Sequence, residues 1–380
     1  MFYKSIRRGI IAVLMISIFS CSSTGVEDQN LVFKNPGPWI NGEPFTLSDK
    51  MGEVVLIDFW TYTCVNCLRT LPYLKDWHRK YSEHGLTIVG VHSPEFDFEK
   101  VPENIALAVS DLGIEYPVFL DNEKETWRIF NNRYWPAKYL IDHEGILRYQ
   151  HFGEGDYAQT EYSIRKHLIR AGFDISGIPE YEIDSDQQVD QYNYKKKQTR
   201  ELYAGTDWNY MAYKNHVEFN REPPYIGNPE YFITSQNLRP NETVLFKDPG
   251  KYEENQFYIH GLWTKKNDSL SHARQTEGHT DYLVLKFSGS EVNAVIGEAE
   301  KLYRVTVTID DVPLKESEAG IDVLFDERGD SYVEVDASRM FNIVKLLKVE
   351  SRILRLSSTH AGFSLYSFTF GSDTHDKWYK

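Results

Sequence analysis

The sequence predicts two folding units, an α/β domain followed by an all-β sandwich or jelly-roll domain. The first observation is a near-continuous apolar run after Glu53 that leads into a segment with helical spacing up to Gly85. The second is a series of short β-branched runs from Phe257 onward, separated by turn residues. A polar stretch lies between the two patterns. A chain of 380 residues has room for about two to three units, each with its own core.

The charge balance excludes several classes of partner. The chain has 56 acidic and 42 basic residues and a net charge of −14. A chain with this acidic balance lacks the basic surface that most nucleic-acid binders use, so we expect no nucleic-acid partner. The same balance argues against attachment to anionic lipids through a polybasic segment. The chain's 3 cysteines are too few for a disulfide-rich scaffold, and their positions therefore matter more than their number.

The N-terminus predicts export and lipid anchoring. Residues 1–20 place three basic side chains ahead of the apolar stretch Ile10–Phe19, and Ser20 follows, as in a secretory signal. Ile18–Cys21 resembles a bacterial lipobox, in which the cysteine is acylated. We therefore expect a lipoprotein signal peptide at 1–20, lipidation of Cys21 and a polar tether at 21–34. The alternative is an ordinary signal peptide with an incidental cysteine. The expected location is the cell envelope, facing the periplasm or the cell exterior.

A cysteine pair follows the first predicted strand. The run after Glu53 predicts a buried central strand, and a helix should follow it. We expect Thr63 to be the N-cap of this helix, Cys64 to lie in its first turn and Gly85 to end it. The apolar positions that give this helix its periodicity are Leu68, Leu71, Leu74 and Trp77.

The position of the pair predicts different roles for its two thiols. The start of a helix stabilises a thiolate, so the pKa of Cys64 is expected to be lowered. Cys67, one turn later, should be shielded by the helix. Cys64 is therefore the predicted nucleophile toward a substrate disulfide, and Cys67 the thiol that resolves the mixed disulfide. The alternatives are half of a zinc site and an inert buried pair. The zinc alternative lacks a second CxxC or an HxxxH pair.

Alternating strands and helices are expected to complete the first domain. After this helix the chain predicts a strand at Leu86–His92, a helix at Val101–Leu112, a short strand, a second helix, a strand at Lys138–Ile141, a turn at Asp142–Gly145 and a strand at Ile146–His151.

These residues resemble the thioredoxin superfamily. Asp58-Phe59-Trp60 stand six residues ahead of Cys64, as in thioredoxins, and the string WTYTCVNCLRTLPYL is most similar to the TlpA and redoxin branch and to the periplasmic part of DipZ-type proteins. The resemblance implies an α/β thioredoxin fold over residues 35–173 and a thiol–disulfide oxidoreductase. It implies no cofactor other than a redox-active Cys64–Cys67 disulfide.

The resemblance also implies roles for four further residues. Asp58 would be a buried base that accepts the Cys67 proton; the alternative is an acid at the strand end that faces water. Trp135-Pro136 would form a cis peptide bond that faces the cysteine pair and lets the backbone of Trp135 bind an extended substrate. Trp60 would contribute to the same substrate site.

The partners follow from the same resemblance. Disulfide-bearing envelope proteins are the expected substrates. This chain has Val65-Asn66 between its cysteines, without the proline of thioredoxin, so the direction of exchange stays open. DipZ-type proteins carry a transmembrane electron-delivery domain that is missing from this sequence. If the cycle is reductive, a separate membrane electron donor of the DsbD or CcdA type is expected.

Peroxidase chemistry is a competing possibility. Thr61 lies three residues before Cys64, a spacing that resembles the Thr-x-x-Cys of peroxiredoxins. The proline those enzymes place four residues before the threonine is Ile57 here. A resolving cysteine only three residues from Cys64 fits dithiol exchange better.

Past the first domain, residues 174–199 predict a linker, because they are polar and lack apolar periodicity. A β-sandwich domain is expected over 200–373, with a short helix at Arg339–Leu347. The expected strands are FYIHGLW, YLVLKF, VNAVI, RVTVTI, SYVEV, ILRLSS and FSLYSFTF.

This half also resembles DipZ-type proteins, through RELYAGT, GLW, VNAVIG and GFSLYSFTFG. In that family the domain is similar to carbohydrate-binding modules, which makes an envelope glycan a possible partner. Packing in the core of the domain is the competing explanation for the aromatic side chains of this half of the chain. A contrasting function is a glycan- or partner-binding envelope protein in which the cysteine pair is only a redox sensor. The aromatic candidates are Tyr203, Trp208, Tyr210, Tyr213, Tyr225, Tyr231 and Trp263.

Overall fold

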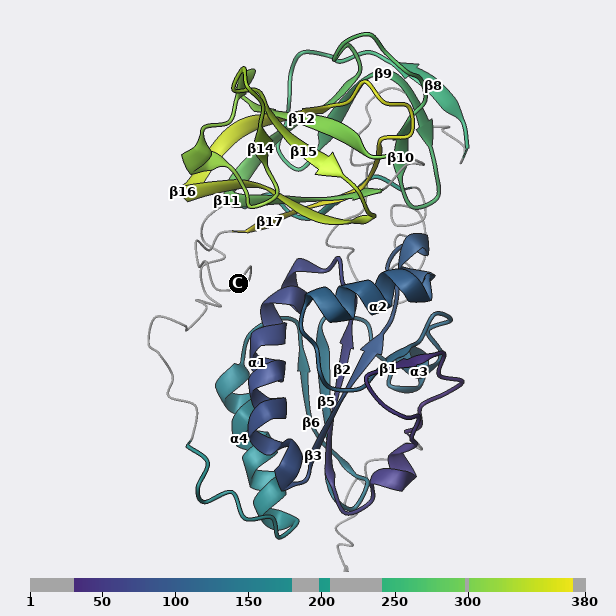
Figure 1. The fold of residues 1–380 in the computed structure, drawn as a ribbon, viewed down its shortest axis with the longest axis vertical. Coiled ribbons are helices and arrows are strands. Elements are labelled where there is room, and N and C mark those ends of the chain that lie inside the picture. Colours follow the sequence, from purple (N-terminus) through teal and green to yellow (C-terminus); the bar gives the residue numbers. More distant parts are fainter. Residues whose placement is uncertain (1–30, 180–197, 206–240, 298–300, 372–380) are drawn as a thin grey trace, which may run out of the picture.

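The computed structural model describes residues 31–179, 198–205, 241–297 and 301–371, and shows two domains (Figure 1). The all-β domain lies against the end of the α/β domain from which helices α1 and α2 begin. The predicted signal peptide, Cys21 and most of the predicted linker lie outside the described residues.

The first domain is built on a six-stranded sheet in the order β1-β4-β3-β2-β5-β6. Strands β2, β3 and β4 are parallel, whereas β1, β5 and β6 pair antiparallel with their neighbours. The strands are β1 (Trp39–Ile40), β2 (Val54–Trp60), β3 (Leu86–His92), β4 (Val118–Leu120), β5 (Ala137–Ile141) and β6 (Leu147–Phe152).

Helices cover both faces of this sheet. Every residue of β2 is buried, and successive side chains of a strand point to opposite faces. Leu56 and Trp60 pack in one apolar cluster with side chains of three helices, α1 (Val65–Tyr81), α2 (Pro102–Asp111) and α4 (Tyr157–Arg170). Ile57 and Phe59 face the other cluster, against α3 (Glu125–Ile129) and the segment that contains β1. This is the predicted α/β arrangement.

The second domain is a large antiparallel sheet that folds into a sandwich-like unit with a single core. The strand order is β14-β15-β12-β16-β11-β17-β10-β9-β8; β13 pairs with β12, β7 with β17, and β11 also with β9. The strands are β7 (Leu202–Tyr203), β8 (Thr243–Phe246), β9 (Phe257–Lys265), β10 (Leu270–His272), β11 (Tyr282–Gly297), β12 (Tyr303–Ile309), β13 (Val312–Pro313), β14 (Leu324–Phe325), β15 (Ser331–Val335), β16 (Arg339–Ser357) and β17 (Ser364–Gly371).

The structure of this domain differs from the sequence predictions in two places. The runs YLVLKF and VNAVI form one 16-residue strand, β11, whose pairing with β16 shifts register between Gly289 and Glu291. The short helix predicted at Arg339–Leu347 is wrong, because these residues begin strand β16 and pair with β11. Val344 lies opposite Val292 in that pairing. Burial of β-branched side chains against a partner strand outweighs the helical spacing of the sequence here.

Both ends of the predicted linker belong to the domains. Ile175 is buried in the core of the first domain. Thr199 is also buried, and its amide donates a hydrogen bond to Ser288 in the second domain.

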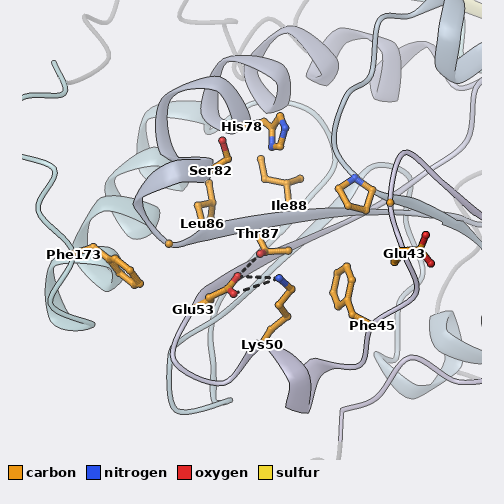
Figure 2. A pocket seen from close by; sticks show the side chains of 13 residues that line it. Glu43, Phe45, Lys50, Glu53, His78, Ser82, Leu86, Thr87, Ile88 and Phe173 are labelled. Carbon is orange, nitrogen blue, oxygen red and sulfur yellow. Dashed lines mark hydrogen bonds and ion pairs between the residues drawn. The ribbon is translucent and has the colours of Figure 1, made fainter.

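A groove lies at the end of the first domain's sheet where β2 and β3 begin, which is the end away from Cys64 (Figure 2). Within it, Lys50 forms an ion pair with Glu53, which also accepts a hydrogen bond from Thr87.

Within the described ranges, none of the helices combines the length and apolar character that crossing a membrane requires.

Candidate redox site

The cysteine pair lies where β2 passes into α1. Cys64 itself is the N-cap of the helix, and its sulfur accepts a hydrogen bond from the amide of Cys67 at 3.2 Å. The prediction that Thr63 caps the helix is therefore wrong by one residue. Thr63 is buried, and its hydroxyl donates to Glu99 at 2.6 Å.

The two thiols differ in access. Cys64 is half-buried, Cys67 is 1% exposed, and both are free. A substrate that approaches from outside meets Cys64 first, while Cys67 lies one turn into the helix behind it. The arrangement has the asymmetry that the sequence predicts for a nucleophile and a resolving thiol.

The electrostatics at Cys64 differ from the sequence expectation. Burial raises the pKa of the Cys64 thiol, and the charges of Glu95 and Glu201 raise it further, against the opposing hydrogen bond from Cys67. The prediction of a lowered pKa is thus wrong for this site. The helix terminus favours a thiolate, whereas burial and two acidic residues that are remote in sequence disfavour it.

Asp58 lies in the buried strand β2. Its carboxyl group is 1% exposed, and burial raises its pKa to about 7, against the opposing charge of Lys138. Asp58 also contributes to raising the pKa of Cys67, well above the ordinary range, although burial is the main cause. Asp58 is therefore close enough to Cys67 for the two groups to influence each other electrostatically.

Lys138 is a site residue that was not predicted from the sequence. It lies directly opposite Asp58 on strand β5 and is fully buried. Among the described residues, neither its ammonium group nor the Oδ1 atom of Asp58 has a hydrogen-bond partner. Burial lowers the pKa of Lys138. The sequence signal for this residue is its position inside the apolar run AKYLI. A lysine there is expected to be buried, and buried lysines are rare without a partner.

A second buried polar cluster lies beside the pair. The Thr61 hydroxyl donates to Glu99 at 2.6 Å and lies 3.2 Å from Nε2 of His92. Burial lowers the pKa of His92 to about 3, so its ring is neutral at physiological pH. The Thr61 hydroxyl, which the peroxidase alternative needs beside the thiolate, is thus engaged with Glu99.

The predicted substrate-docking residues are only partly suited to that role. Trp135-Pro136 is a cis peptide bond, as expected. Trp135 is half-buried, and its indole donates to the carbonyl of Ser93 at 2.9 Å. The prediction of a substrate contact for Trp60 is wrong for this structure, because its side chain is 0% exposed and packs inside the core.

The second domain touches the redox site directly. An apolar cluster at the junction combines Val65 and Phe96 of the first domain with Val295 and Met340 of the second. The hydroxyl of Tyr203 donates to Glu95 at 2.7 Å. Residues from both domains therefore surround the N-terminus of α1.

Two of the aromatic candidates in the second domain, Trp263 and Tyr203, pack within the structure instead. Trp263 is 0% exposed and lies in the core, which excludes it from a surface platform for sugar stacking. Tyr203 lies at the domain junction, and the other aromatic candidates are outside the described residues. In the part of the chain that the structure describes, no group of three or more His, Cys, Asp or Glu side chains is arranged to hold a metal ion.

Known proteins resemble both halves of the chain. Residues 28–150 match the AhpC/TSA family, and residues 225–371 match a family described as a thioredoxin-like C-terminal domain. Protein DipZ of Mycobacterium bovis is 50% identical over 133 residues, which are 34% of this chain and 19% of DipZ. Thiol-disulfide oxidoreductase YkuV of Bacillus subtilis is 30% identical over 131 residues, 34% of this chain and 87% of YkuV. A thiol-disulfide isomerase from Corynebacterium glutamicum, known from its crystal structure, is 24% identical and covers 38% of this chain and 98% of its own, with a TM-score of 0.35.

The chain belongs to the thiol–disulfide oxidoreductases of the thioredoxin superfamily. Its N-terminal half has the thioredoxin-like fold that the sequence predicts, and its C-terminal half is the predicted β-sandwich-like domain. The chain spans only 19% of the length of its DipZ relative.

Proposed function

We propose that this protein is an exported, lipid-anchored thiol–disulfide oxidoreductase that exchanges disulfides with proteins of the cell envelope. The observation that carries the proposal is the asymmetric pair at the start of α1: a half-buried Cys64, a buried Cys67 and a buried Asp58 whose charge acts on Cys67. The similarity to YkuV and to DipZ supports the same chemistry.

In the reductive direction the cycle has two exchange steps. The Cys64 thiolate attacks one sulfur of a substrate disulfide; the substrate S–S bond breaks, and the departing thiolate takes up a proton. Cys67 then loses its proton to Asp58 and attacks Cys64. The mixed disulfide breaks, the second substrate thiol leaves, and a Cys64–Cys67 disulfide remains. The substrate gains two electrons, and the cysteine pair loses them.

The pair must then be reduced again. We propose a membrane electron donor of the DsbD or CcdA type for this step, because the oxidised pair needs two electrons that its substrates in the reductive cycle do not supply. The half-buried Trp135, beside Pro136, is the proposed docking position for an extended substrate segment. No cofactor other than the disulfide is required.

Insulin reduction with dithiothreitol tests the activity. The wild-type protein is expected to accelerate precipitation of the insulin B chain. Cys64→Ser is expected to abolish the acceleration, because it removes the attacking sulfur. Cys67→Ser should trap a mixed disulfide through Cys64 that mass spectrometry detects. A wild-type protein that neither accelerates the reaction nor exchanges its cysteines with dithiothreitol would overturn the proposal.

Anchoring is tested separately, with the full chain expressed in a bacterium that processes lipoproteins. Wild-type protein is expected to incorporate labelled palmitate and to fractionate with membranes. Cys21→Ala should remove the label and leave the redox activity of the purified protein unchanged. Equal labelling of the two proteins would contradict acylation at Cys21.

Peroxidase activity is not favoured as a second function, because the Thr61 hydroxyl is engaged with Glu99.

A further inference from the structure

A buried carboxylate holds the loop that precedes Cys64. Glu99 lies in a single turn of 3₁₀ helix between β3 and α2, and it is 0% exposed. Its Oε1 atom accepts hydrogen bonds from the hydroxyl groups of Thr61 and Thr63, each at 2.6 Å. Both threonines are buried and lie in the short loop between the end of β2 and Cys64. The side chain of Glu99 therefore binds this loop at two points.

The second oxygen of Glu99 binds a different loop. Its Oε2 atom accepts hydrogen bonds from the backbone amides of Glu95 at 2.6 Å and of Phe96 at 2.9 Å. These residues follow β3, in the segment that starts with Ser93, whose carbonyl accepts the indole N–H of Trp135 at 2.9 Å. Glu99 thus joins the loop of the nucleophile to the loop that contacts Trp135, the proposed docking position for the substrate.

The four donors use the full accepting capacity of a carboxylate. An ionised carboxylate has about four accepting positions on its two oxygens, whereas the glutamine side chain has one accepting oxygen and an NH₂ group that donates. In a Glu99→Gln variant, two of the four buried donors would lose their acceptor in either orientation of the amide, and such a loss is costly inside a protein. Burial raises the pKa of Glu99, and the hydrogen bonds from both loops oppose that shift.

The loop that Glu99 binds sets the position of the nucleophile. The carbonyl of Thr61 accepts the amide of Cys64 at 3.4 Å, and Thr63 directly precedes Cys64. The single hydroxyl hydrogen of Thr61 goes to Glu99, so Nε2 of His92, at 3.2 Å, is the donor to the same hydroxyl oxygen. Because Cys64 is the N-cap of α1, a movement of this loop also moves the sulfur of Cys64.

We propose that Glu99 is a positioning residue of the redox site that orients Cys64 toward a substrate disulfide docked beside Trp135. This inference rests on the proposed function and adds a residue to its first step, in which the Cys64 sulfur bonds to one sulfur of the substrate and the substrate S–S bond breaks. That step needs the sulfurs in a near-attack geometry, and a displacement of about 1 Å can slow such a step by about 10²-fold. Glu99 acts on Cys64 through Thr61 and Thr63.

The test removes the hydrogen bonds of Glu99 in the full chain. Thr61→Val and Thr63→Val keep the branched shape of the side chain but lose its hydroxyl, whereas Thr61→Ser and Thr63→Ser keep the hydroxyl and are the matched conservative variants. Glu99→Gln removes the acceptor. Glu161→Gln is the control for a general loss of stability, because Glu161 is also a buried carboxylate and accepts hydrogen bonds from Trp77 and Tyr81 within the core.

Two reactions of Cys64 are compared in each variant. Exchange with a disulfide-bonded peptide requires an oriented sulfur, and stopped-flow kinetics measures its first step. Alkylation by iodoacetamide, in a Cys67→Ser background, requires only the thiolate, because this small reagent reacts without docking. Its rate is read on the plateau of the pH profile, where Cys64 is fully ionised. Thermal unfolding of the same samples reports stability.

The proposal expects exchange to slow while alkylation stays at the wild-type rate. Exchange should be about 10-fold to 100-fold slower in Glu99→Gln and about threefold to tenfold slower in each valine variant, as expected for a misplaced reacting group. Each serine variant should retain the larger part of the wild-type exchange rate. Glu161→Gln should unfold at a lower temperature and exchange at the wild-type rate.

Three results would overturn the inference. Wild-type exchange in Glu99→Gln would exclude a positioning role, and alkylation that slows as much as exchange would show that orientation is not the cause. Equal slowing in Glu161→Gln would reduce the effect to a loss of stability. If Glu99→Gln does not fold, equal exchange rates within the valine and serine pairs would reject the inference. Insulin reduction by the wild-type protein judges the proposed function separately; activity there with unaffected variants would reject only the role of Glu99.

Discussion

At the scale of single residues, Asp58 shows what burial does to one carboxyl group. It is almost fully shielded within β2, and its pKa is raised to about 7, mainly by burial. The group is therefore half-protonated near neutral pH. That state suits a base that has to take up a proton from Cys67 and release it in each cycle.

Asp58 also makes stability depend on pH. A carboxyl whose pKa is higher in the folded state binds more protons when folded, so the free energy of unfolding is greatest below pH 4 and decreases as the pH rises toward about 7. We expect Asp58→Asn to be more stable than wild type at pH 8, by on the order of 2 kcal/mol, and to show no gain at pH 4. Urea unfolding at the two pH values measures this.

Glu123→Gln is the control for that comparison, because Glu123 is exposed and its replacement should leave the pH dependence unchanged. An Asp58→Asn protein with the wild-type stability at pH 8 would contradict the raised pKa of Asp58.

The same group predicts a pH-dependent resolving step. In the proposed cycle the ionised Asp58 carboxylate accepts the Cys67 proton, so release of the mixed disulfide should become faster as the pH rises through about 7. In Asp58→Asn this rise should be lost and the step slowed by about 10²-fold, while attack by Cys64 is little changed. Stopped-flow kinetics with a disulfide peptide separates the two steps. Equal resolving rates in the two proteins would exclude Asp58 as the base.

How far the sequence predicts the site depends on the distance between its residues along the chain. Cys64, Cys67 and Asp58 lie within one strand and helix turn, so the local sequence and its resemblance to thioredoxins are enough to suggest the roles proposed for them. Glu95 and Glu201 come near the site only through the tertiary fold, and no motif around either residue indicates this position. For this reason the predicted direction of the Cys64 pKa shift was wrong.

At the scale of elements, the central strands and helix α1 of the first domain were predictable because they have strong local patterns. Strand β1 and helix α4 of that domain were not predicted. Strand β16 of the second domain was predicted wrongly in its first half. Its first half, Arg339–Leu347, has apolar residues at spacings that fit a helix, and only the pairing with β11 makes it a strand. Local sequence decides less when a long strand is stabilised by partners on both sides.

Strand β16 offers a comparison that separates strand from helix. Val344 is 0% exposed and Leu347 is 91% exposed, although residues three apart would share a face of a helix. We expect Val344→Ala to lower the free energy of unfolding by about 1–3 kcal/mol. Leu347→Ala should change it by less than about 0.5 kcal/mol. Equal losses in chemical denaturation would contradict the strand.

At the scale of the whole molecule, the junction joins the catalytic helix to the second domain. The side chains of Arg69 and Glu291 are only 11% and 10% exposed, so their ion pair is shielded from solvent. The junction could not be predicted from the sequence. Its apolar members, among them Val65 and Met340, come from separate segments and look like ordinary core residues.

A double-mutant cycle measures the strength of this link. For Arg69→Met and Glu291→Gln we expect a coupling free energy of about 1–3 kcal/mol, since removing one partner leaves a shielded charge. The exposed pair Arg304–Glu334 within the second domain is the control and should give less than about 1 kcal/mol. Thermal unfolding should also resolve two transitions in the Arg69→Met protein where wild type shows one. A coupling no larger than that of the control would show that the domains are held without this ion pair.

The cover that the second domain places over Val65 and Phe96 limits how a client can approach. One flank of Cys64 is closed by the β domain, so in the proposed cycle a client approaches from a side that this domain leaves uncovered. A disulfide recessed in a finished globular protein would clash with that cover before its sulfur reached Cys64. We therefore expect the enzyme to select cysteines in flexible segments, and so to act on proteins that are still maturing.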